Sequence, residues 1–336
     1  MPHNVQRPAQ SSIDGIRRFV ASTPWMMLPG YLEAMLEVLQ LRAAGTRFTE
    51  DEIDARLAAA DHGALSAAGP AAGRPVSPSS GAIAVIPIEG IIAQKARMVD
   101  NASGPRGTST EAITQAFDAA MADPAISAIV FAINSPGGTI NGVPEAARHI
   151  FANRGTKRII SSVTGLGASA AYYLAAAADE ISVTPSGEAG SIGVFMVHTD
   201  LSGALAAEGV KQTVIRAGKY KAEGHPAEPL GDVALAAMQG RVNEAYDMMV
   251  KDIAQFRAVP VATVRDGYGE GRVLGAAKSV ESGMADRVAT LDEVVSRLAS
   301  PRGGAKPGTP RRSIDVMRKR IALDVGVVRA VTAADD

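Results

Sequence analysis

From residue 81 onward, short runs rich in β-branched residues alternate with stretches of helical periodicity. This alternation is typical of βα units around a mostly parallel sheet, because each helix carries the chain back to the start of the next strand. The sequence therefore predicts an α/β fold. The expected strands are 82–88, 126–134, 158–164, 180–184, 193–199 and 211–217, and the expected helices are 110–122, 142–153, 168–178, 201–208 and 231–256, before a final segment, 271–299, of two short helices around a strand.

Two stretches of low complexity border this α/β region. Residues 63–80 are almost wholly Ala, Gly, Pro and Ser, and PRGGAKPGTPRRS begins at residue 301. Such compositions are typical of flexible linkers. Before them, LPGYLEAMLEVLQL has helical spacing, and Thr49 with Glu52 forms a capping-box pattern. We therefore expect a helical N-terminal segment at 1–62, a linker at 63–80, the main domain at 81–300, and a linker with a basic tail at 301–336.

Composition excludes several classes of protein. Lys and Arg number 34 against 35 Asp and Glu, so a net charge of −1 leaves no overall footprint for nucleic acid or an anionic membrane. The absence of cysteine excludes disulfides, catalytic thiolates and thiolate zinc sites. The apolar segment 19–41 is interrupted by two prolines and two glutamates, which predicts an amphipathic helix and not a membrane span. We therefore expect a cytoplasmic location.

Two glycine-containing turns follow adjacent predicted strands. One is NSPGGTING, residues 134–142, and the other is TGLGASAA, residues 164–171. Ligands of α/β proteins bind at the carboxyl ends of the strands, where loops converge over a rigid sheet. The two turns therefore indicate a single site.

The second turn places Ser169 at the start of a predicted helix. Gly165 and Gly167 permit a tight strand-to-helix turn, and the flanking alanines keep bulk away from the hydroxyl. GASAA resembles a nucleophile elbow with Ala in place of the last Gly. An N-cap serine is the ordinary alternative for this position, and the stretch by itself does not decide between the two.

The first turn supplies candidate hydrogen-bond donors. Pro136 restricts the backbone, and Gly137 and Gly138 allow the main chain to approach a ligand closely. Their N–H groups, together with that of Ala170, could hold an oxyanion beside Ser169. Alone, SPGG is also an ordinary turn between a strand and a helix, but with GASAA about 30 residues downstream the pair indicates nucleophilic catalysis.

A serine nucleophile needs a base, and histidine is the first candidate. The five histidines are His3, His62, His149, His198 and His225. The first two lie outside the main domain, and His149 belongs to a predicted helix. His198 stands 29 positions after Ser169 and is the one histidine at a plausible place for a Ser–His pair, although a polar residue at a strand end is the more ordinary interpretation.

Lysine is the other candidate base. IRAGKYKAEGHP, residues 215–226, follows a predicted strand and contains Lys219 and Lys221. A lysine accepts a proton only where burial beside the nucleophile lowers its pKa from about 10.4. On an extended chain both side chains would face one side, with Tyr220 opposite, so the residues alone leave the choice between them open, and a solvated basic loop is the alternative.

In this order along the chain, the motifs resemble the signal peptide peptidase A family of Ser-Lys serine peptidases. The resemblance covers residues 81 to about 298 and rests on AIAVIPIEGII, INSPGG, GLGASAAYYLAAAADEI, AGSIGV, IRAGKYKAEGHP and GRVLGAAKSVESGMADRV. PWMMLPGYLEAML and VHTDLSGALAAEGVKQTVIRAGKYKAEG are similar to the phage branch, the lambdoid capsid assembly proteases. The resemblance implies a Clp/crotonase-like fold of repeated ββα units, here with a helical N-terminal preface.

The resemblance also implies roles for individual residues. It makes Ser169 the nucleophile and Lys221, the second lysine of GKYK, the base. Ser191 of AGSIGV corresponds to the serine that orients the lysine. The oxyanion donors implied by the match are Gly137, Gly138 and Ala170.

The function implied is a serine endopeptidase that cleaves scaffold, portal-associated or other head proteins during phage capsid maturation, in the host cytoplasm or the prohead. The resemblance implies a homo-oligomeric ring with protein substrates and no metal or cofactor, and nucleic acid is not an expected partner. In such rings Ser169 and Lys221 of one site can come from neighbouring chains. The alternatives are a housekeeping peptidase for signal peptides or oligopeptides, an acyl-CoA enzyme of the crotonase type, and an inactive scaffold-like homologue.

Overall fold

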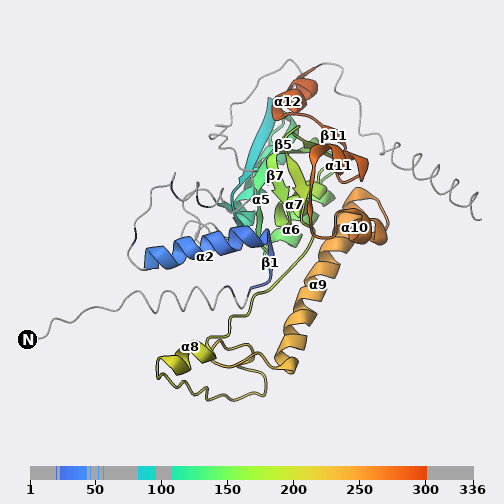
Figure 1. Cartoon of the computed structure of the whole chain (residues 1–336). Helices are drawn as coiled ribbons and strands as arrows, with labels where there is room; N and C mark the ends of the chain where they lie inside the picture. The colour runs from blue at the N-terminus through green and yellow to red at the C-terminus, as the bar shows by residue number, and fades with distance from the viewer. Residues whose placement is uncertain are drawn as a thin grey trace, which may run out of the picture.

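The computed structural model describes residues 23–43, 82–95 and 107–300, together with the isolated positions 20, 46, 52 and 56. The predicted linker at 63–80, the tail at 301–336 and Thr49 of the predicted capping box lie outside the described residues. Figure 1 shows a sheet with helices packed around it and one long helix, α9 (Asp232–Arg257), leading away from the sheet.

The main sheet has seven strands and confirms the predicted α/β fold. Five of them run in the order β10-β9-β7-β5-β2, and β8 pairs with β7 and β11. The pairs within β2, β5, β7, β8, β9 and β11 are parallel, and only β10 is antiparallel to its neighbour β9. The strands are β2 (Ala82–Glu89), β5 (Ile126–Ser135), β7 (Arg158–Ala168), β8 (Glu180–Val183), β9 (Glu188–Gly190), β10 (Val273–Gly275) and β11 (Arg287–Val288).

A second, smaller sheet lies at the carboxyl ends of β5 and β7. Its order is β1-β6-β3-β4, in which β1 is antiparallel to β6 and the other pairs are parallel. The strands are β1 (Trp25–Met27), β3 (Ile92–Ala93), β4 (Thr108–Ser109) and β6 (Gly137–Thr139). Since β6 contains both glycines of the SPGG turn, this sheet includes part of one of the two predicted loops.

Both faces of the main sheet are buried, and successive residues of β5 point to opposite faces. Ile129, Phe131 and Ile133 point into the larger core cluster, and Ala128 and Val130 point into a cluster on the opposite face. The larger core contains α5 (Thr110–Ala122), α6 (Val143–Ala152) and α7 (Ala170–Ala176), and the opposite face is covered by α12 (Leu291–Ala299). The remaining helices are α2 (Pro29–Ala43), α8 (Ser202–Ala207), α10 (Val261–Gly267) and α11 (Ala276–Glu281).

The predicted helices near 110–122, 142–153, 168–178, 201–208 and 231–256 are confirmed, but part of the predicted N-terminal helix is wrong. Residues 25–27 form a strand, and α2 begins only at Pro29. Proline disfavours helical backbone at the residue before it and is well suited to the first turn of a helix. Pro29 therefore separates an extended segment from the helix, and the extended segment pairs with β6.

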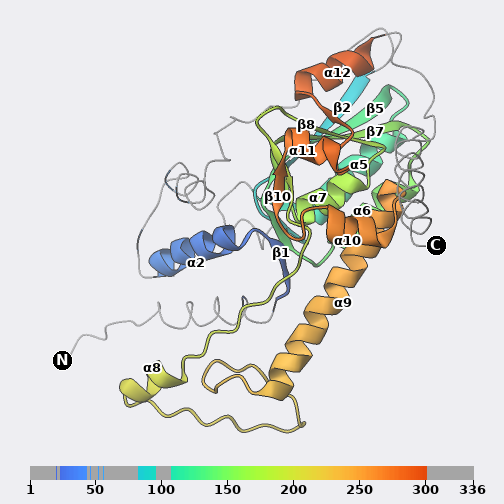
Figure 2. The same cartoon turned by 45° about the vertical axis from the view of Figure 1, so that its right-hand side comes forward.

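Two predicted strands, 193–199 and 211–217, are wrong. The first makes only one bridge, between Phe195 and Trp25, and the second forms no strand at all. Both lie on a connection that leaves the sheet after Ile192, and without a neighbouring strand an extended segment has no ladder to join. We call residues 196–231 the arm; Figures 1 and 2 show its helix α8 at the far end of α9 from the main sheet.

Candidate active site

The two glycine turns lie side by side, as expected from their places at the ends of adjacent strands. Ser135 is paired with Gly167 in the register of β5 and β7. The amide oxygen of Asn134 accepts a hydrogen bond from the N–H of Leu166 at 3.1 Å. A Cβ on Gly165 would stand 2.7 Å from that same oxygen, so only glycine leaves room for this link between the turns.

Ser169 lies at the N-terminus of α7 in an unusual backbone conformation. Its φ of 55° and ψ of −112° fall where non-glycine residues are rare, and its side chain makes no capping hydrogen bond. The Oγ instead donates to the carbonyl oxygen of Gly193 at 3.4 Å, which is long for a hydroxyl donor. The residue is fully buried. An N-cap role therefore does not explain this serine.

The backbone around Ser169 is held on both sides. Its N–H donates to the carbonyl oxygen of Gly190 at 2.7 Å, and its own carbonyl oxygen accepts from the N–H of Tyr173 at 2.9 Å. Ala168 and Gly190 are partners in the register of β7 and β9. These bonds fix the turn that carries the hydroxyl.

The SPGG turn presents its backbone to the same place. Gly137 has a φ of +101°, and a Cβ there would lie 2.2 Å from the carbonyl oxygen of Met26 and 3.1 Å from that of Ala168. Gly138 lies in β6 between β1 and β3, where a Cβ would meet the oxygen of Ile92 at 1.8 Å. The turn therefore tolerates only glycine at both positions.

The predicted oxyanion donors differ in their partners. The N–H of Gly137 donates to the Oγ of Ser135 at 3.1 Å, inside its own turn. Ala170 is the first residue of α7, where an N–H has no partner within the helix. Gly138 is the register partner of Met26 across β6 and β1. Of the three, Ala170 presents the N–H least engaged by secondary structure.

Ser191 lies directly after β9, the strand that pairs with the end of β7. It is buried, has a left-handed φ of 52°, and donates its N–H to the carbonyl oxygen of Arg272 at 2.8 Å. Its neighbour Gly190 has a φ of +131° and receives the N–H of Ser169. The chain thus places Ser191 one residue from a direct backbone contact of Ser169.

The structure does not bring the candidate bases to Ser169. Lys221 is exposed on the arm in a run of turns, 219–224, and among the described residues no hydrogen bond or ion pair joins it to either serine. The ammonium of Lys219 lies 4.9 Å from the ring centroid of Tyr220. His198 also belongs to the arm, where its ring packs near Gly224, and its buried Nε2 has no hydrogen-bond partner.

Residues 152–303 match the profile of peptidase family S49. The chain contains a peptidase family S49 domain. The Clp/crotonase-like α/β fold implied by the sequence motifs agrees with this match and with the parallel sheet. The matched range contains Ser169, Ser191 and Lys221, and the SPGG turn precedes it.

Proteins similar to this chain include two phage proteins and a bacterial protease. The chain is 28% identical over 214 residues to "Capsid assembly protease C" of Escherichia phage lambda, a match that covers 64% of this chain and 48% of the relative. It is 30% identical over 230 residues to "Head-tail preconnector protein GP5" of Enterobacteria phage P21, covering 67% and 45%. It is 27% identical over 231 residues to "Protease 4" of Salmonella typhi, covering 66% and 35%. The chain spans less than half the length of these three relatives.

Buried polar groups that no sequence motif indicates hold α7 of the S49 domain. The hydroxyl of Tyr173 donates to the carboxylate of Asp252, which also receives the guanidinium of Arg148 at 2.8 Å. Burial, together with the bond to Asp252, raises the pKa of the Tyr173 hydroxyl well above its usual range, so the hydroxyl stays a donor. Asp252 is the one charged residue on the buried face of α9, within MMVKDIAQF, and an acidic residue at an apolar position of the helical pattern is the sequence signal that could have identified it.

Arg154 holds the other end of α7. Its guanidinium donates to the carbonyl oxygens of Ala176, Ala177 and Ala178, at the C-terminus of the helix, and to that of Phe256 on α9. Burial lowers the pKa of Arg154 to about 10, a value at which it remains charged at neutral pH. A cation there satisfies the last carbonyls and complements the helix dipole.

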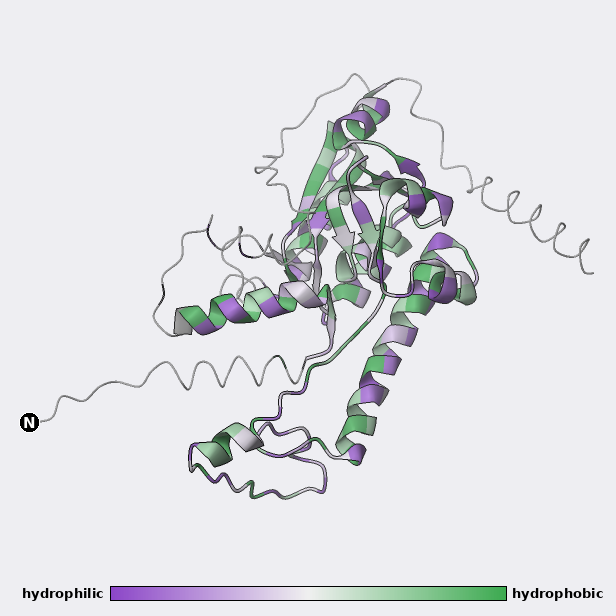
Figure 3. Cartoon of the chain, in the orientation of Figure 1, coloured by the Kyte–Doolittle hydropathy of each residue, from purple (hydrophilic) through white to green (hydrophobic). Residues whose placement is uncertain are grey.

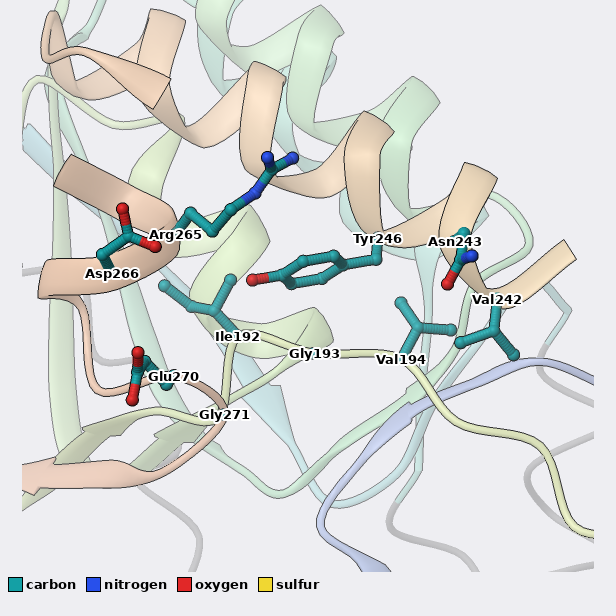
Figure 4. A pocket seen from close by; sticks show the side chains of 10 residues that line it. All are labelled: Ile192, Gly193, Val194, Val242, Asn243, Tyr246, Arg265, Asp266, Glu270 and Gly271. Atoms are coloured by element: carbon teal, nitrogen blue, oxygen red, sulfur yellow. The ribbon is translucent and has the colours of Figure 1, made fainter. Parts of the chain in front are cut away.

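A pocket of about 370 Å³ opens beside Gly193, whose carbonyl oxygen accepts from Ser169. Tyr246 projects from α9 across the pocket toward Ile192, and Arg265 reaches over it from α10 (Figure 4). The guanidinium of Arg265 also binds Asp247 at 2.7 Å. The wall is completed by Val194, Val242, Asn243, Asp266, Glu270 and Gly271.

Within residues 23–43, 82–95 and 107–300, no group of three His, Asp or Glu side chains is arranged to ligate a metal ion. Over the same part of the chain, none of the helices combines the length and the apolar character that crossing a membrane requires.

Proposed function

We propose that this chain is a serine endopeptidase in which Ser169 is the nucleophile and Lys221 the base. The observation that carries the proposal is the conformation of Ser169, a buried hydroxyl on a strained strand-to-helix turn whose side chain makes no capping hydrogen bond. Strained backbone persists where the surrounding structure enforces it, and such positions concentrate at functional sites. The adjoining SPGG turn and the S49 match support the same assignment.

In the proposed reaction Ser169 gives its proton to the neutral amine of Lys221 as Oγ attacks the scissile carbonyl. The oxyanion that forms is stabilised by the N–H groups of Ala170 and the SPGG glycines, Gly137 and Gly138. The Lys221 ammonium then protonates the leaving amine, and water hydrolyses the acyl-enzyme by the same route. Ser191 would orient the lysine through a hydrogen bond.

The arm has the features expected of a segment that docks onto another copy of the chain. None of the residues from Gly193 to Val233 is buried. Six of the eight exposed large hydrophobic side chains among the described residues lie on the arm and the start of α9, and Ile215 is 94% exposed. Figure 3 shows hydrophobic positions recurring there, away from the sheet. The six residues are Val197, Val210, Ile215, Tyr220, Val233 and Leu235.

We therefore propose a homo-oligomer in which Lys221 of one chain enters the site of its neighbour. Burying the exposed side chains of the arm would stabilise the assembly by about 25 cal/mol per Å² of apolar surface. A lysine side chain in water is protonated at neutral pH. Transfer to a site without water favours the neutral amine, which is the form that can act as a base. Assembly would then create the base as well as position it.

The names of the phage relatives guide the proposal for the substrate. Capsid assembly protease C and head-tail preconnector protein GP5 point to the scaffold, portal-associated or other head proteins of a phage, cleaved in the host cytoplasm or the prohead. An extended segment of such a protein would pass Ser169 with one side chain directed toward the pocket around Tyr246. Protease 4 represents the housekeeping alternative.

Co-expression with the capsid and scaffold proteins encoded beside this chain tests the proposal. Ser169→Ala and Lys221→Ala should each abolish processing, detected by mass spectrometry of the products, while Lys219→Ala should process normally. Processing that continues in both inactive-site variants would show that the dyad is assigned wrongly. No processing by the wild-type chain, with no trapping of Ser169 by a serine-reactive phosphonate, would support an inactive homologue.

A further inference from the structure

The strand β1 is hydrogen-bonded along both of its edges. On one side Trp25, Met26 and Met27 are register partners of Thr139, Gly138 and Gly137 in β6, and the N–H of Leu28 donates to the oxygen of Pro136 at 3.1 Å. On the other side, Trp25 donates to the oxygen of Phe195 at 2.8 Å and accepts from its N–H at 3.1 Å. The segment from Pro24 to Leu28 therefore lies between β6 and Phe195, and we call the space that it occupies the channel.

This channel borders the candidate active site. The carbonyl oxygens of Met26 and Ala168 both flank Gly137, since they would lie 2.2 Å and 3.1 Å from a Cβ on that residue. Ala168 immediately precedes Ser169, and Ser169 has no exposed surface. Figures 1 and 2 show β1 at the end of the domain from which the chain continues into the arm. A peptide cannot reach a hydroxyl that has no exposed surface, so a segment beside the site must move before cleavage.

The side chains of the segment alternate between the two walls of the channel. Trp25 and Met27 belong to the same core cluster as Leu166 and Ala168, whereas Met26 belongs to the larger core cluster. All three side chains are buried. The same arrangement is found when an extended peptide binds by adding a strand to a sheet edge. Main-chain hydrogen bonds then give affinity, and alternate side chains occupy pockets.

We propose that this channel is the substrate-strand site of the peptidase and that Pro24–Leu28 is its internal occupant, a pseudosubstrate that must leave before cleavage. The inference rests on the proposed function, because it identifies what closes that site and how a substrate would lie in it. The ligand class is an extended peptide with large apolar side chains at alternate positions. Because the occupant is tethered to the domain, its effective concentration far exceeds that of a free peptide.

The absence of native cysteine allows a test that does not depend on catalysis. In the full-length Ser169→Cys chain, iodoacetamide should modify the single thiol slowly. Adding Trp25→Ala and Met27→Ala, which truncate the two β1 side chains that share a core cluster with Leu166 and Ala168, should accelerate modification at least about tenfold. Met249→Ala, which truncates a fully buried side chain of the main core, controls for general loss of stability and should leave the rate unchanged.

Equal thiol rates in the Ser169→Cys chain with and without the strand substitutions would overturn the inference and make β1 a permanent part of the core. If the double substitution prevents folding, Met27→Ala alone should still raise the rate of thiol modification. An unchanged rate in that variant would likewise overturn the inference. A synthetic peptide of residues 23–31 should slow modification of the opened chain, and a scrambled peptide should not; equal effects of the two peptides would also count against the channel.

Hydrolysis separates this inference from the proposed function. With Ser169 intact, Trp25→Ala/Met27→Ala should cleave an unstructured protein such as casein faster than the wild type. Faster thiol modification, with no hydrolysis by the wild type or by Trp25→Ala/Met27→Ala, would support the channel and contradict the proposed peptidase activity. Hydrolysis at equal rates, together with unchanged thiol accessibility, would retain the peptidase and refute the pseudosubstrate.

Discussion

The N–H of Gly137 donates its hydrogen bond to the Oγ of Ser135, at 3.1 Å, and both residues belong to the turn that faces Ser169. An N–H that stabilises an oxyanion must point at the developing charge. The Ser135 hydroxyl therefore competes with the proposed oxyanion for this donor. The bond is also buried, so it stabilises the turn in the absence of substrate, as pairing does for any buried N–H.

Ser135→Ala removes this competitor. We expect kcat/KM to rise by about threefold to tenfold and the free energy of unfolding to fall by about 1 kcal/mol, since the freed N–H is paired only in the transition state. Steady-state hydrolysis and thermal unfolding measure the two effects. Ser162→Ala is the matched control, because the Ser162 hydroxyl is buried in β7 without a hydrogen-bond partner. A fall in kcat/KM for Ser135→Ala would instead mean that the bond supports the active turn.

Gly137→Ala should damage both stability and activity. Its added Cβ would meet the oxygen of Met26 at 2.2 Å in a backbone conformation that already disfavours a side chain. We expect a loss of about 3 kcal/mol in the free energy of unfolding and at least a hundredfold loss of activity. Gly155→Ala is the control, because Gly155 has a φ of +88° with nothing within 4 Å of the added Cβ. It should cost about 1 kcal/mol and leave kcat unchanged.

The buried carboxylate of Glu180 predicts a pH-dependent stability. Burial raises its pKa, but hydrogen bonds and charges from three arginines prevail and lower the pKa below 4.5. The three partners are Arg158, Arg287 and Arg297. A lowered pKa stabilises the fold above the unfolded value, and this stability disappears as the pH falls through the folded value.

Glu180→Gln should therefore lower the free energy of unfolding by about 2 kcal/mol at pH 7. This loss is smaller than is usual for breaking a buried ion pair, because the arginines are partly exposed to solvent. Urea titrations from pH 7 to pH 3 should show the difference from wild type shrinking below about pH 4.5. Asp247→Asn, which breaks the exposed pair with Arg265, should cost less than 1 kcal/mol. A difference that stays constant with pH would exclude the charge as its cause.

The arm predicts an assembly that one exposed side chain can disrupt. Ile215→Ser should reduce the oligomer mass measured by sedimentation and lower activity in parallel, because Ile215 would be buried only between chains. Val288→Ser changes an exposed side chain on the domain itself and should do neither. An Ile215→Ser chain that sediments and cleaves like wild type would place the interface elsewhere.

Mixing tests whether the two proposed catalytic residues come from different chains. Inactive Ser169→Ala and inactive Lys221→Ala chains, dissociated and assembled together, should regain part of the wild-type activity, since some sites would combine an intact Ser169 with an intact Lys221. Each variant assembled alone is the control. If the mixture stays inactive while forming oligomers of wild-type mass, both residues must act within one chain.

Much of the fold follows from local patterns. The alternation of β-branched runs with helical spacing predicted four of the main parallel strands and the helices between them, since these signals depend on residues a few positions apart. The glycines likewise predicted two tight turns. The pairing of Ser135 with Gly167 confirms that these turns lie side by side. The strands predicted on the arm failed because β-branched residues favour a strand only where a neighbour pairs with them.

The sequence by itself determined the parallel α/β order, the paired glycine turns and the position of Ser169 at a helix start, because each depends on chain-local sterics and periodicity. Only the tertiary structure decided that Trp25 pairs with Phe195, that Ser135 takes the Gly137 N–H, and that Glu180 gathers Arg287 and Arg297 from 107 and 117 positions away. Such contacts join segments distant in the chain, and their energy depends on burial and alignment that no local pattern encodes.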